Sequence, residues 1–131
     1  MKFNSTEPIY VQIVNYVSEH IVMGKWNNHE KIPSVRDLAI RLEVNPNTIS
    51  RAYEFLEQLN VIYNKRGIGF FVAEDGLNVI NDYNKKIFKN KDLPKFFLKL
   101  TMMKIQLSDL EDDFNKFLSD KNKLDERHQT E

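Results

Sequence analysis

Hydrophobic residues recur at helical spacing in the first part of the chain. A stripe with four-residue spacing predicts a helix that begins near Pro8 and buries one face. Gly24 follows the stripe and suits the left-handed position that ends many helices. The stripe consists of Ile9, Ile13, Val17 and Ile21.

Two further helices are predicted after a polar connection. Ser34 begins the first, because Ser34 and Asp37 have the spacing of a capping box with Asp in place of Glu or Gln. Asn45 and Pro46 begin the second, since Asn is a favoured N-cap and Pro a favoured first helical residue. Asn60 can end it in the left-handed conformation. The apolar positions on their buried sides are Leu38, Ala39 and Leu42, then Ile49, Ala52, Tyr53, Leu56 and Leu59.

Two β-rich runs, residues 61–63 and 70–72, predict a hairpin with a basic, glycine-containing tip. The expected fold class is therefore mainly α with a small β-hairpin. We expect a winged helix-turn-helix over residues 1–74, a helical segment over residues 75–118 and a polar, disordered tail over residues 119–131.

The helical segment leaves one question open. Pro94 either kinks a continuing helix or lies in the first turn of a new helix capped by Asp92. Ser108 and Glu111 have capping-box spacing, which predicts the start of a last helix. Two or three short helices cannot bury all the large apolar side chains here, so we expect this segment to form a homodimer. The expected dimerisation residues are Ile80, Ile87, Phe96, Phe97, Leu100, Leu110, Phe114 and Phe117.

Composition excludes several classes of protein. The chain has no cysteine, so a disulfide framework and a cysteine zinc site are excluded. No apolar run approaches the roughly 20 residues that cross a bilayer, and the first residues lack a signal-peptide core. We therefore expect a cytoplasmic protein with no membrane partner. The net charge is zero, so binding to nucleic acid must depend on local basic surface.

The second and third predicted helices have the order and spacing of a helix-turn-helix. In this motif the second helix lies in the DNA major groove, and its N-terminal residues meet base edges. Here those residues are Asn47, Thr48, Ser50 and Arg51, which can bind bases or phosphates. Taken singly, a capped helix or a basic loop is more often only structural, and the order of the elements is what favours a DNA-binding function.

Two other places suit phosphate. The start of the second helix offers free backbone N–H groups beside Ser34 and Arg36. The hairpin tip carries Lys65, Arg66 and Gly67, which we expect to approach the DNA backbone or minor groove. Double-stranded operator DNA is thus the expected partner.

Four blocks of this sequence, in order, resemble the GntR family of bacterial regulators. The blocks are Pro8–Ile13 (PIYVQI), Ile32–Ala39 (IPSVRDLA), Val44–Glu57 (VNPNTISRAYEFLE) and Arg66–Val72 (RGIGFFV). The resemblance covers about half of the chain and implies a winged-helix transcriptional regulator.

The resemblance also implies roles for single residues. Arg36, Thr48, Arg51 and Arg66 with Gly67 match family positions that contact DNA, whereas Asn47 is variable in the family and can tune operator choice. The short helical segment after residue 74 is similar to that of the YtrA subfamily, whose C-terminal helices dimerise and whose members are often repressors.

Two residues depart from the family pattern. His29 and Asn60 stand where the family commonly has Gly, and both residue types tolerate a left-handed backbone. We therefore expect neither departure to disturb the fold.

Other classes of function are less well supported. The histidines His20, His29 and His128 lack metal-ligand spacing, and acids at residues 109–113 suit the positive end of a helix. No enzyme activity and no cofactor are expected, and the sequence names no small-molecule effector. The aromatic residues of the C-terminal half could line a ligand pocket, although a dimer core is favoured. The main alternative is a winged helix that contacts protein or RNA instead of duplex DNA.

Overall fold

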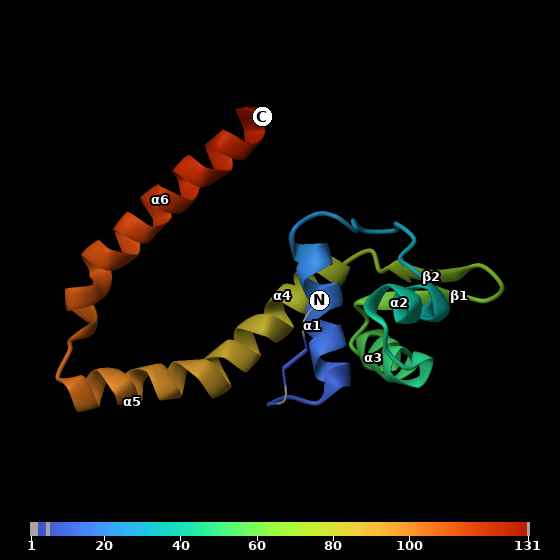
Figure 1. Cartoon of the computed structure of the whole chain (residues 1–131), viewed down its shortest axis with the longest axis horizontal. Coiled ribbons are helices and arrows are strands. Elements are labelled where there is room, and N and C mark those ends of the chain that lie inside the picture. Colours follow the sequence, from blue (N-terminus) through green and yellow to red (C-terminus); the bar gives the residue numbers. More distant parts are fainter. Residues whose placement is uncertain (1–2, 5, 131) are drawn as a thin grey trace. The chain divides into compact units, whose positions relative to one another are not determined.

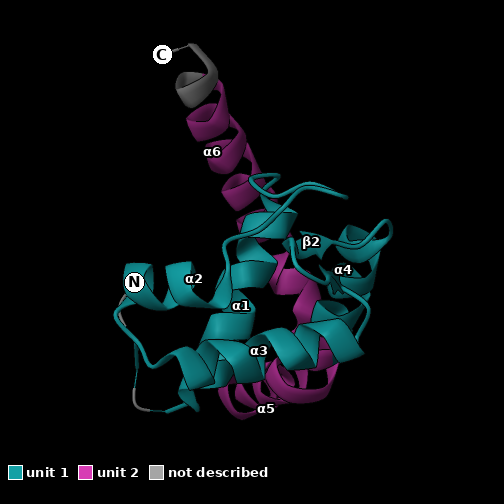
Figure 2. Cartoon of the chain, turned by 90° about the vertical axis from the view of Figure 1, so that its right-hand side faces the viewer, with its two compact units in different colours: residues 1–86 teal, residues 87–131 magenta. Residues whose placement is uncertain are grey.

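The computed structural model describes residues 3–4 and 6–130, with side chains up to Glu126, and divides into two compact units. The first unit is residues 1–86 and the second is residues 87–131 (Figure 2). The elements of the first unit are α1 (Ile9–Val22), α2 (Val35–Leu42), α3 (Pro46–Gln58), β1 (Ile62–Lys65), β2 (Gly69–Val72) and all but the last residue of α4 (Gly76–Ile87) (Figure 1). Those of the second are η1 (Phe88–Asp92), α5 (Leu93–Met103), η2 (Leu107–Leu110) and α6 (Glu111–Thr130).

The first unit is a winged helix-turn-helix, as the sequence predicted. Its core is formed where α1 and α2 pack on α3 and the hairpin closes one side. The apolar faces of the helices match those that helical spacing predicted, except that Ile9 is 45% exposed and Leu59 is half-buried. The most deeply buried side chains include Ile13, Val17, Leu38, Ile49, Tyr53, Leu56, Ile62 and Val72.

The starts of α2 and α3 are each fixed by a local hydrogen bond. Ser34 Oγ accepts a bond of 3.1 Å from the Asp37 N–H, and Asn45 Oδ1 accepts one of 2.8 Å from the Asn47 N–H. Glu43 ends α2 with a left-handed φ of 56°. The predicted N-caps of both helices are therefore confirmed.

The hairpin gains support from the segment that precedes α2. Strands β1 and β2 are antiparallel, with Ile62 opposite Val72 and Lys65 opposite Gly69. Lys31 forms an additional bridge with Phe71, and the Ile32 N–H donates to Phe70 O at 2.9 Å. This third segment ties the hairpin to the start of α2.

The two residues that depart from the family pattern adopt the expected conformation. His29 has φ 67° and Asn60 has φ 66°, both left-handed. The His29 N–H donates to Val72 O at 2.8 Å, so the turn is part of the hairpin's hydrogen-bonded edge. Neither substitution for glycine disturbs the fold.

Helix α4 belongs to the first unit, which corrects the predicted boundary at residue 74. Ile80 is fully buried in the core of this unit, and Asn84 Nδ2 donates to Ser18 Oγ of α1 at 2.8 Å. Gly76 allows the close approach, because a Cβ there would lie 2.6 Å from the Val61 carbonyl oxygen. Ile80 is therefore a core residue and is removed from the expected dimerisation set.

The second unit settles the question about Pro94. Asp92 has helical angles and no side-chain cap bond, and the π-helical turn η1 leads directly from α4 into α5. The wider π turn accommodates a proline that cannot donate a backbone hydrogen bond. Pro94 thus lies near the start of α5 within a continuing helical path.

The start of the last helix differs from the prediction. The capping box is formed by Gln106 and Asp109, with the Gln106 N–H donating to Asp109 Oδ2 at 3.0 Å. Ser108 lies inside the 3-10 turn η2, because the extended backbone that a cap needs occurs at Gln106. Helix α6 continues to Thr130, so residues 119–130 are helical instead of a disordered tail, and residue 131 lies outside the described residues.

Candidate nucleic-acid interface

Helix α3 exposes a polar face at its N-terminal end. Asn47, Ser50 and Arg51 are exposed and Thr48 is half-buried. The opposite face is buried in the core through Ile49, Ala52, Tyr53 and Leu56. The spacing of these apolar residues therefore determines which polar side chains point outward. The exposed ones match the positions that a recognition helix uses to contact base edges.

The electrostatics of this helix start suit an anionic partner. Pro46 and the Asn45 cap begin the helix, and its first turn contains no acidic residue. The N-terminal end of a helix carries partial positive charge from its aligned peptide dipoles. A phosphate group close to this end would be attracted rather than repelled.

The start of α2 combines a cap with a cation. The Ser34 hydroxyl accepts a hydrogen bond from the Asp37 N–H and keeps its own proton free to donate. Arg36 is exposed in the same turn, next to the acidic Asp37. Arg36 and Asp37 carry opposite charges, which partly offset each other at this helix start.

Tyr53 connects α3 to the segment that precedes α2. Its hydroxyl donates a 2.6 Å hydrogen bond to Pro33 O, and its ring packs edge-on against Phe70 of β2. Burial raises the pKa of Tyr53, and Arg41 acts in the opposite direction. One buried side chain thus holds together α3, the start of α2 and the hairpin.

The hairpin tip presents the predicted basic residues to solvent. Lys65, Arg66 and Gly67 are exposed, and Gly67 has a left-handed φ of 81° with open space around its Cα. Lys65 Nζ lies 5.3 Å from the ring centroid of Phe71. Ile68 is also exposed at this tip, which the sequence analysis did not single out. An apolar residue between two glycines of a loop was the signal available for it.

The structure adds a contact that the sequence analysis missed. The guanidinium carbon of Arg51 lies 4.0 Å from the centroid of the Tyr10 ring, which belongs to α1. In the sequence analysis Tyr10 was only part of the block Pro8–Ile13 and had no role in DNA binding. No local pattern could have found this pair, because its members belong to different helices far apart in the sequence.

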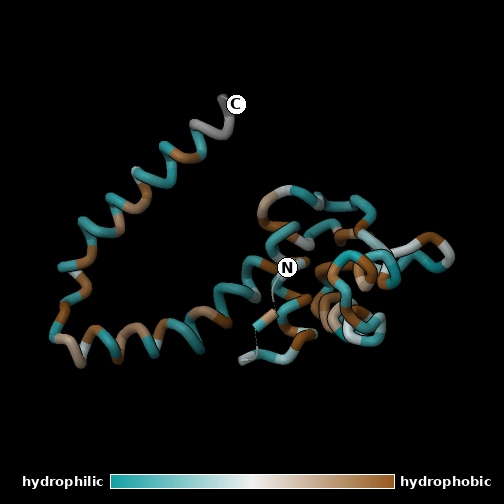
Figure 3. The backbone as a smooth tube through the Cα atoms, viewed as in Figure 1, coloured by the Kyte–Doolittle hydropathy of each residue, from teal (hydrophilic) through white to brown (hydrophobic). Residues whose placement is uncertain are grey.

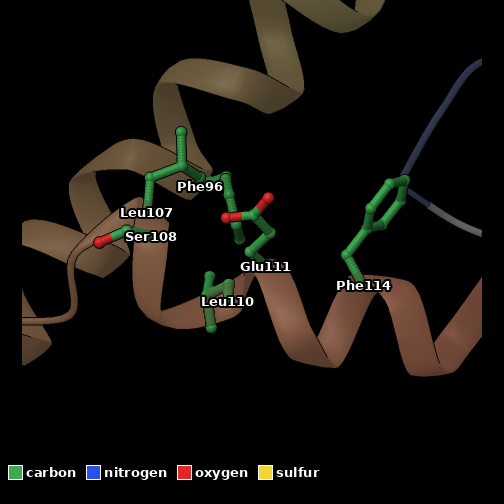
Figure 4. Close-up of a pocket in the computed structure, with 6 residues that line it drawn as sticks. All are labelled: Phe96, Leu107, Ser108, Leu110, Glu111 and Phe114. Carbon is green, nitrogen blue, oxygen red and sulfur yellow. The ribbon is translucent and has the colours of Figure 1, made fainter.

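The expected dimerisation residues of the second unit differ in exposure. Phe96, Phe97, Phe114 and Phe117 are exposed, Ile87 and Leu110 are half-buried, and Leu100 is buried by its own chain. Hydrophobic positions recur along both α5 and α6 (Figure 3). An apolar hollow of about 510 Å³ lies within this unit (Figure 4). Its lining residues are Phe96, Leu107, Ser108, Leu110, Glu111 and Phe114.

The described residues contain neither a membrane-spanning helix nor a cluster of metal ligands. No helix of that part of the chain is long and apolar enough to cross a membrane. No three acidic or histidine side chains among the described residues are grouped so that they could hold a metal ion, and this includes the acidic cluster at residues 109–113.

Known proteins resemble this chain in both sequence and fold. Residues 9–72 match the family described as bacterial regulatory proteins, gntR family. The chain is 37% identical to the uncharacterized HTH-type transcriptional regulator YhcF of Bacillus subtilis over 66% of this chain and 70% of that protein. It is 34% identical to the HTH-type transcriptional repressor YtrA of Bacillus subtilis over 66% of this chain and 67% of that protein.

Solved structures give the same result. A putative GntR-family transcriptional regulator from Bacteroides thetaiotaomicron aligns with a TM-score of 0.74 and 36% identity, over 87% of this chain and 99% of that one. A structure of AraR(DBD) in complex with operator ORR3 aligns with a TM-score of 0.51 and 30% identity, over 56% of this chain and 88% of that one. The chain therefore belongs to the gntR family of bacterial transcriptional regulators, and its winged helix is the DNA-binding domain of that family.

Proposed function

We propose that this chain is a sequence-specific repressor that binds a pseudo-palindromic operator as a homodimer. The observation that carries the proposal is the exposed polar face of α3, which presents Asn47, Ser50 and Arg51 beside a helix start free of acidic residues. Repression is supported by the similarity to YtrA, which is named a repressor. Operator binding is supported by the similarity to AraR(DBD), whose structure contains an operator.

Each part of the first unit has a separate role in this proposal. Arg51 binds a guanine through its guanidinium edge, and Asn47 and Ser50 contact neighbouring bases or phosphates. Lys65 and Arg66 at the hairpin tip bind the backbone or minor groove, where Gly67 permits close approach. Thr48, Ser34 and Arg36 bind phosphates and fix the register.

Dimerisation through the second unit is supported by its exposed aromatic surface. A phenylalanine buries roughly 150–250 Å² when it is fully covered, so four rings at about half exposure leave on the order of 400 Å² in water. Exposed leucines and methionines of α5, η2 and α6 add to this area, namely Leu98, Met102, Met103, Leu107, Leu118 and Leu124. The largest apolar patch of a typical monomer is about 300–600 Å² in total. A second copy would cover this surface.

The dimer is tested by removing aromatic rings that the single chain does not bury. Phe114 and Phe117 are 60% and 62% exposed on α6, so changing both to Ser leaves the fold of one chain intact. Ile40→Ser is the matched control, because Ile40 is 68% exposed on α2 of the other unit. Sedimentation equilibrium at micromolar concentration should show a dimer for the native chain and the control, and a monomer for the double variant. A monomeric native chain, or a dimeric double variant, would contradict the proposed dimer.

DNA recognition is tested by selection of bound duplexes from random DNA. We expect a recurrent motif with two related half-sites about one helical turn, roughly 34 Å, apart. A fragment of residues 1–86 keeps α4, which is part of its core, and lacks the proposed dimerisation unit. It should bind a half-site weakly and as a monomer. If selection yields no preferred duplex, while a protein or an RNA is bound specifically, the winged helix serves that other partner.

A further inference from the structure

Arg51 is held against an aromatic ring that lies outside the helix-turn-helix. Its guanidinium carbon is 4.0 Å from the ring centroid of Tyr10, in the first turn of α1. A cation over an aromatic face at this distance is attracted by the ring's quadrupole. The exposed face of α3 therefore includes a side chain whose head group packs on an aromatic ring in the free protein.

The start of α1 that carries Tyr10 is itself held in place. The buried Gln12 amide donates to Asn4 O at 2.9 Å and to Glu7 O at 3.0 Å, and its oxygen accepts from the Asn4 N–H at 3.0 Å. These bonds clamp the segment before α1 onto the first turn of the helix. The backbone that supports the Tyr10 ring is thus hydrogen-bonded on its N-terminal side.

A further aromatic contact joins α4 to α3. Tyr83 is half-buried and packs edge-on against Phe55 of α3, with ring centroids 5.6 Å apart. Burial raises the pKa of Tyr83, and the Tyr10 phenol raises it further. Tyr83 thus packs through Phe55 on α3, the helix that also carries Arg51.

We infer that Tyr10 is a positioning residue for DNA recognition, because its ring holds the guanidinium of Arg51 in the orientation that binds a base. The inference rests on the proposed role of Arg51. Stacking uses the flat face of the guanidinium, whereas hydrogen bonds to a guanine use the N–H groups along its edge. Both interactions are possible at once. A head group held before binding loses less conformational freedom when it meets the base.

The test compares two substitutions of Tyr10 on the full-length chain with a selected operator. Tyr10→Leu removes the aromatic face and keeps apolar bulk, whereas Tyr10→Phe keeps the face and removes the hydroxyl. We expect Tyr10→Leu to lower affinity for the operator by about two- to tenfold. Discrimination between bases should weaken only at the position where Arg51→Ala also weakens it. Tyr10→Phe should remain within about twofold of the native protein. In an Arg51→Ala background, Tyr10→Leu should cause no further loss.

A fold defect is separated from a positioning defect by thermal unfolding of each variant. If Tyr10→Leu unfolds, pentafluorophenylalanine at this position serves instead, because it keeps the ring's shape and reverses its quadrupole. That replacement should bind more weakly than Tyr10→Phe, and equal binding would overturn the inference.

Three results with a folded Tyr10→Leu variant would also overturn the inference. These are unchanged affinity, increased affinity, and an equal loss in the Arg51→Ala background. An Arg51→Ala variant with unchanged base preference would instead contradict the proposed function, so the two failures can be told apart.

Discussion

Tyr53 offers a test of how α3 is held in the first unit. Its hydroxyl donates a 2.6 Å hydrogen bond to Pro33 O, and its side chain is buried. Tyr53→Phe keeps the ring and leaves the carbonyl without this donor. A lost neutral hydrogen bond with a buried acceptor costs about 1–2 kcal/mol of unfolding free energy at pH 7. For a chain of this size, the midpoint of thermal unfolding of Tyr53→Phe should lie about 3–8 °C below that of the native protein.

The raised pKa of Tyr53 adds a dependence on pH with a definite sign. The unfolded chain releases the phenol proton near pH 10, while the folded protein retains it because burial disfavours the phenolate. Above about pH 10 the unfolded state binds fewer protons, so this contribution to stability falls by up to about 1.4 kcal/mol per pH unit. The contribution is fully present below pH 10 and declines as pH rises toward the folded-state value.

Chemical denaturation of the native protein and Tyr53→Phe at pH 7, 10 and 11 measures both effects. The native protein should be more stable than Tyr53→Phe at pH 7, and this difference in unfolding free energy should shrink or reverse by pH 11. Tyr63→Phe, on the half-buried ring of β1, is the matched control for loss of a phenol and should leave stability within about 0.5 kcal/mol at pH 7. A difference between native protein and Tyr53→Phe that stays constant with pH would refute the reasoning.

Three further predictions concern the interface and its support. Gly76→Ala should destabilise the protein by about 1–3 kcal/mol in denaturant unfolding, because its Cβ would meet the Val61 carbonyl oxygen at 2.6 Å. Gly67→Ala should cost only about 1 kcal/mol, for its left-handed φ. Equal losses of stability in the two variants would contradict the close contact at Gly76. Changing Lys65 and Arg66 to Ala should weaken binding to all duplexes and reduce the salt slope by about one to two, and an unchanged slope would exclude phosphate contact by the tip. Asn45→Ala should cost about 0.5–2 kcal/mol of stability through the lost cap of α3, measured by thermal unfolding, and no loss would show that the cap is dispensable.

Local chemistry made the helix-turn-helix predictable. Ser34 and Asn45 cap their helices through bonds to residues two or three positions away, and such bonds depend only on neighbouring residues. Asn60 and His29 tolerate the left-handed backbone for the same local reason. The exposed face of α3 then followed from the spacing of its apolar residues.

Contacts between distant segments were not predictable from one sequence. The docking of α4 depends on Gly76 meeting the Val61 backbone and on Ile80 filling the core, and helical periodicity alone gives Ile80 no partner. The same limit hid the stacking of Arg51 on Tyr10. These packing contacts decide which residues belong to the DNA-binding unit.

The start of α6 shows a different limit. Gln106 and Ser108 both had an acidic residue three positions later, and only backbone geometry selects between such overlapping caps. The polar composition of residues 119–130 predicted disorder, whereas the helix continues through them. Half of these residues are good helix formers, namely Lys, Leu, Glu, Arg and Gln. Composition alone did not separate an exposed helix from a tail.

In the proposed function, the exposed face of α3 determines which DNA sequence is bound. The most direct measurement is the affinity of the native protein and of Arg51→Ala for the selected operator and for each of its single-base variants. Arg51→Ala should lose about 1–3 kcal/mol of discrimination at one base position in each half-site and keep its preferences elsewhere. Identical preferences at every position would contradict the claim that Arg51 contacts a base.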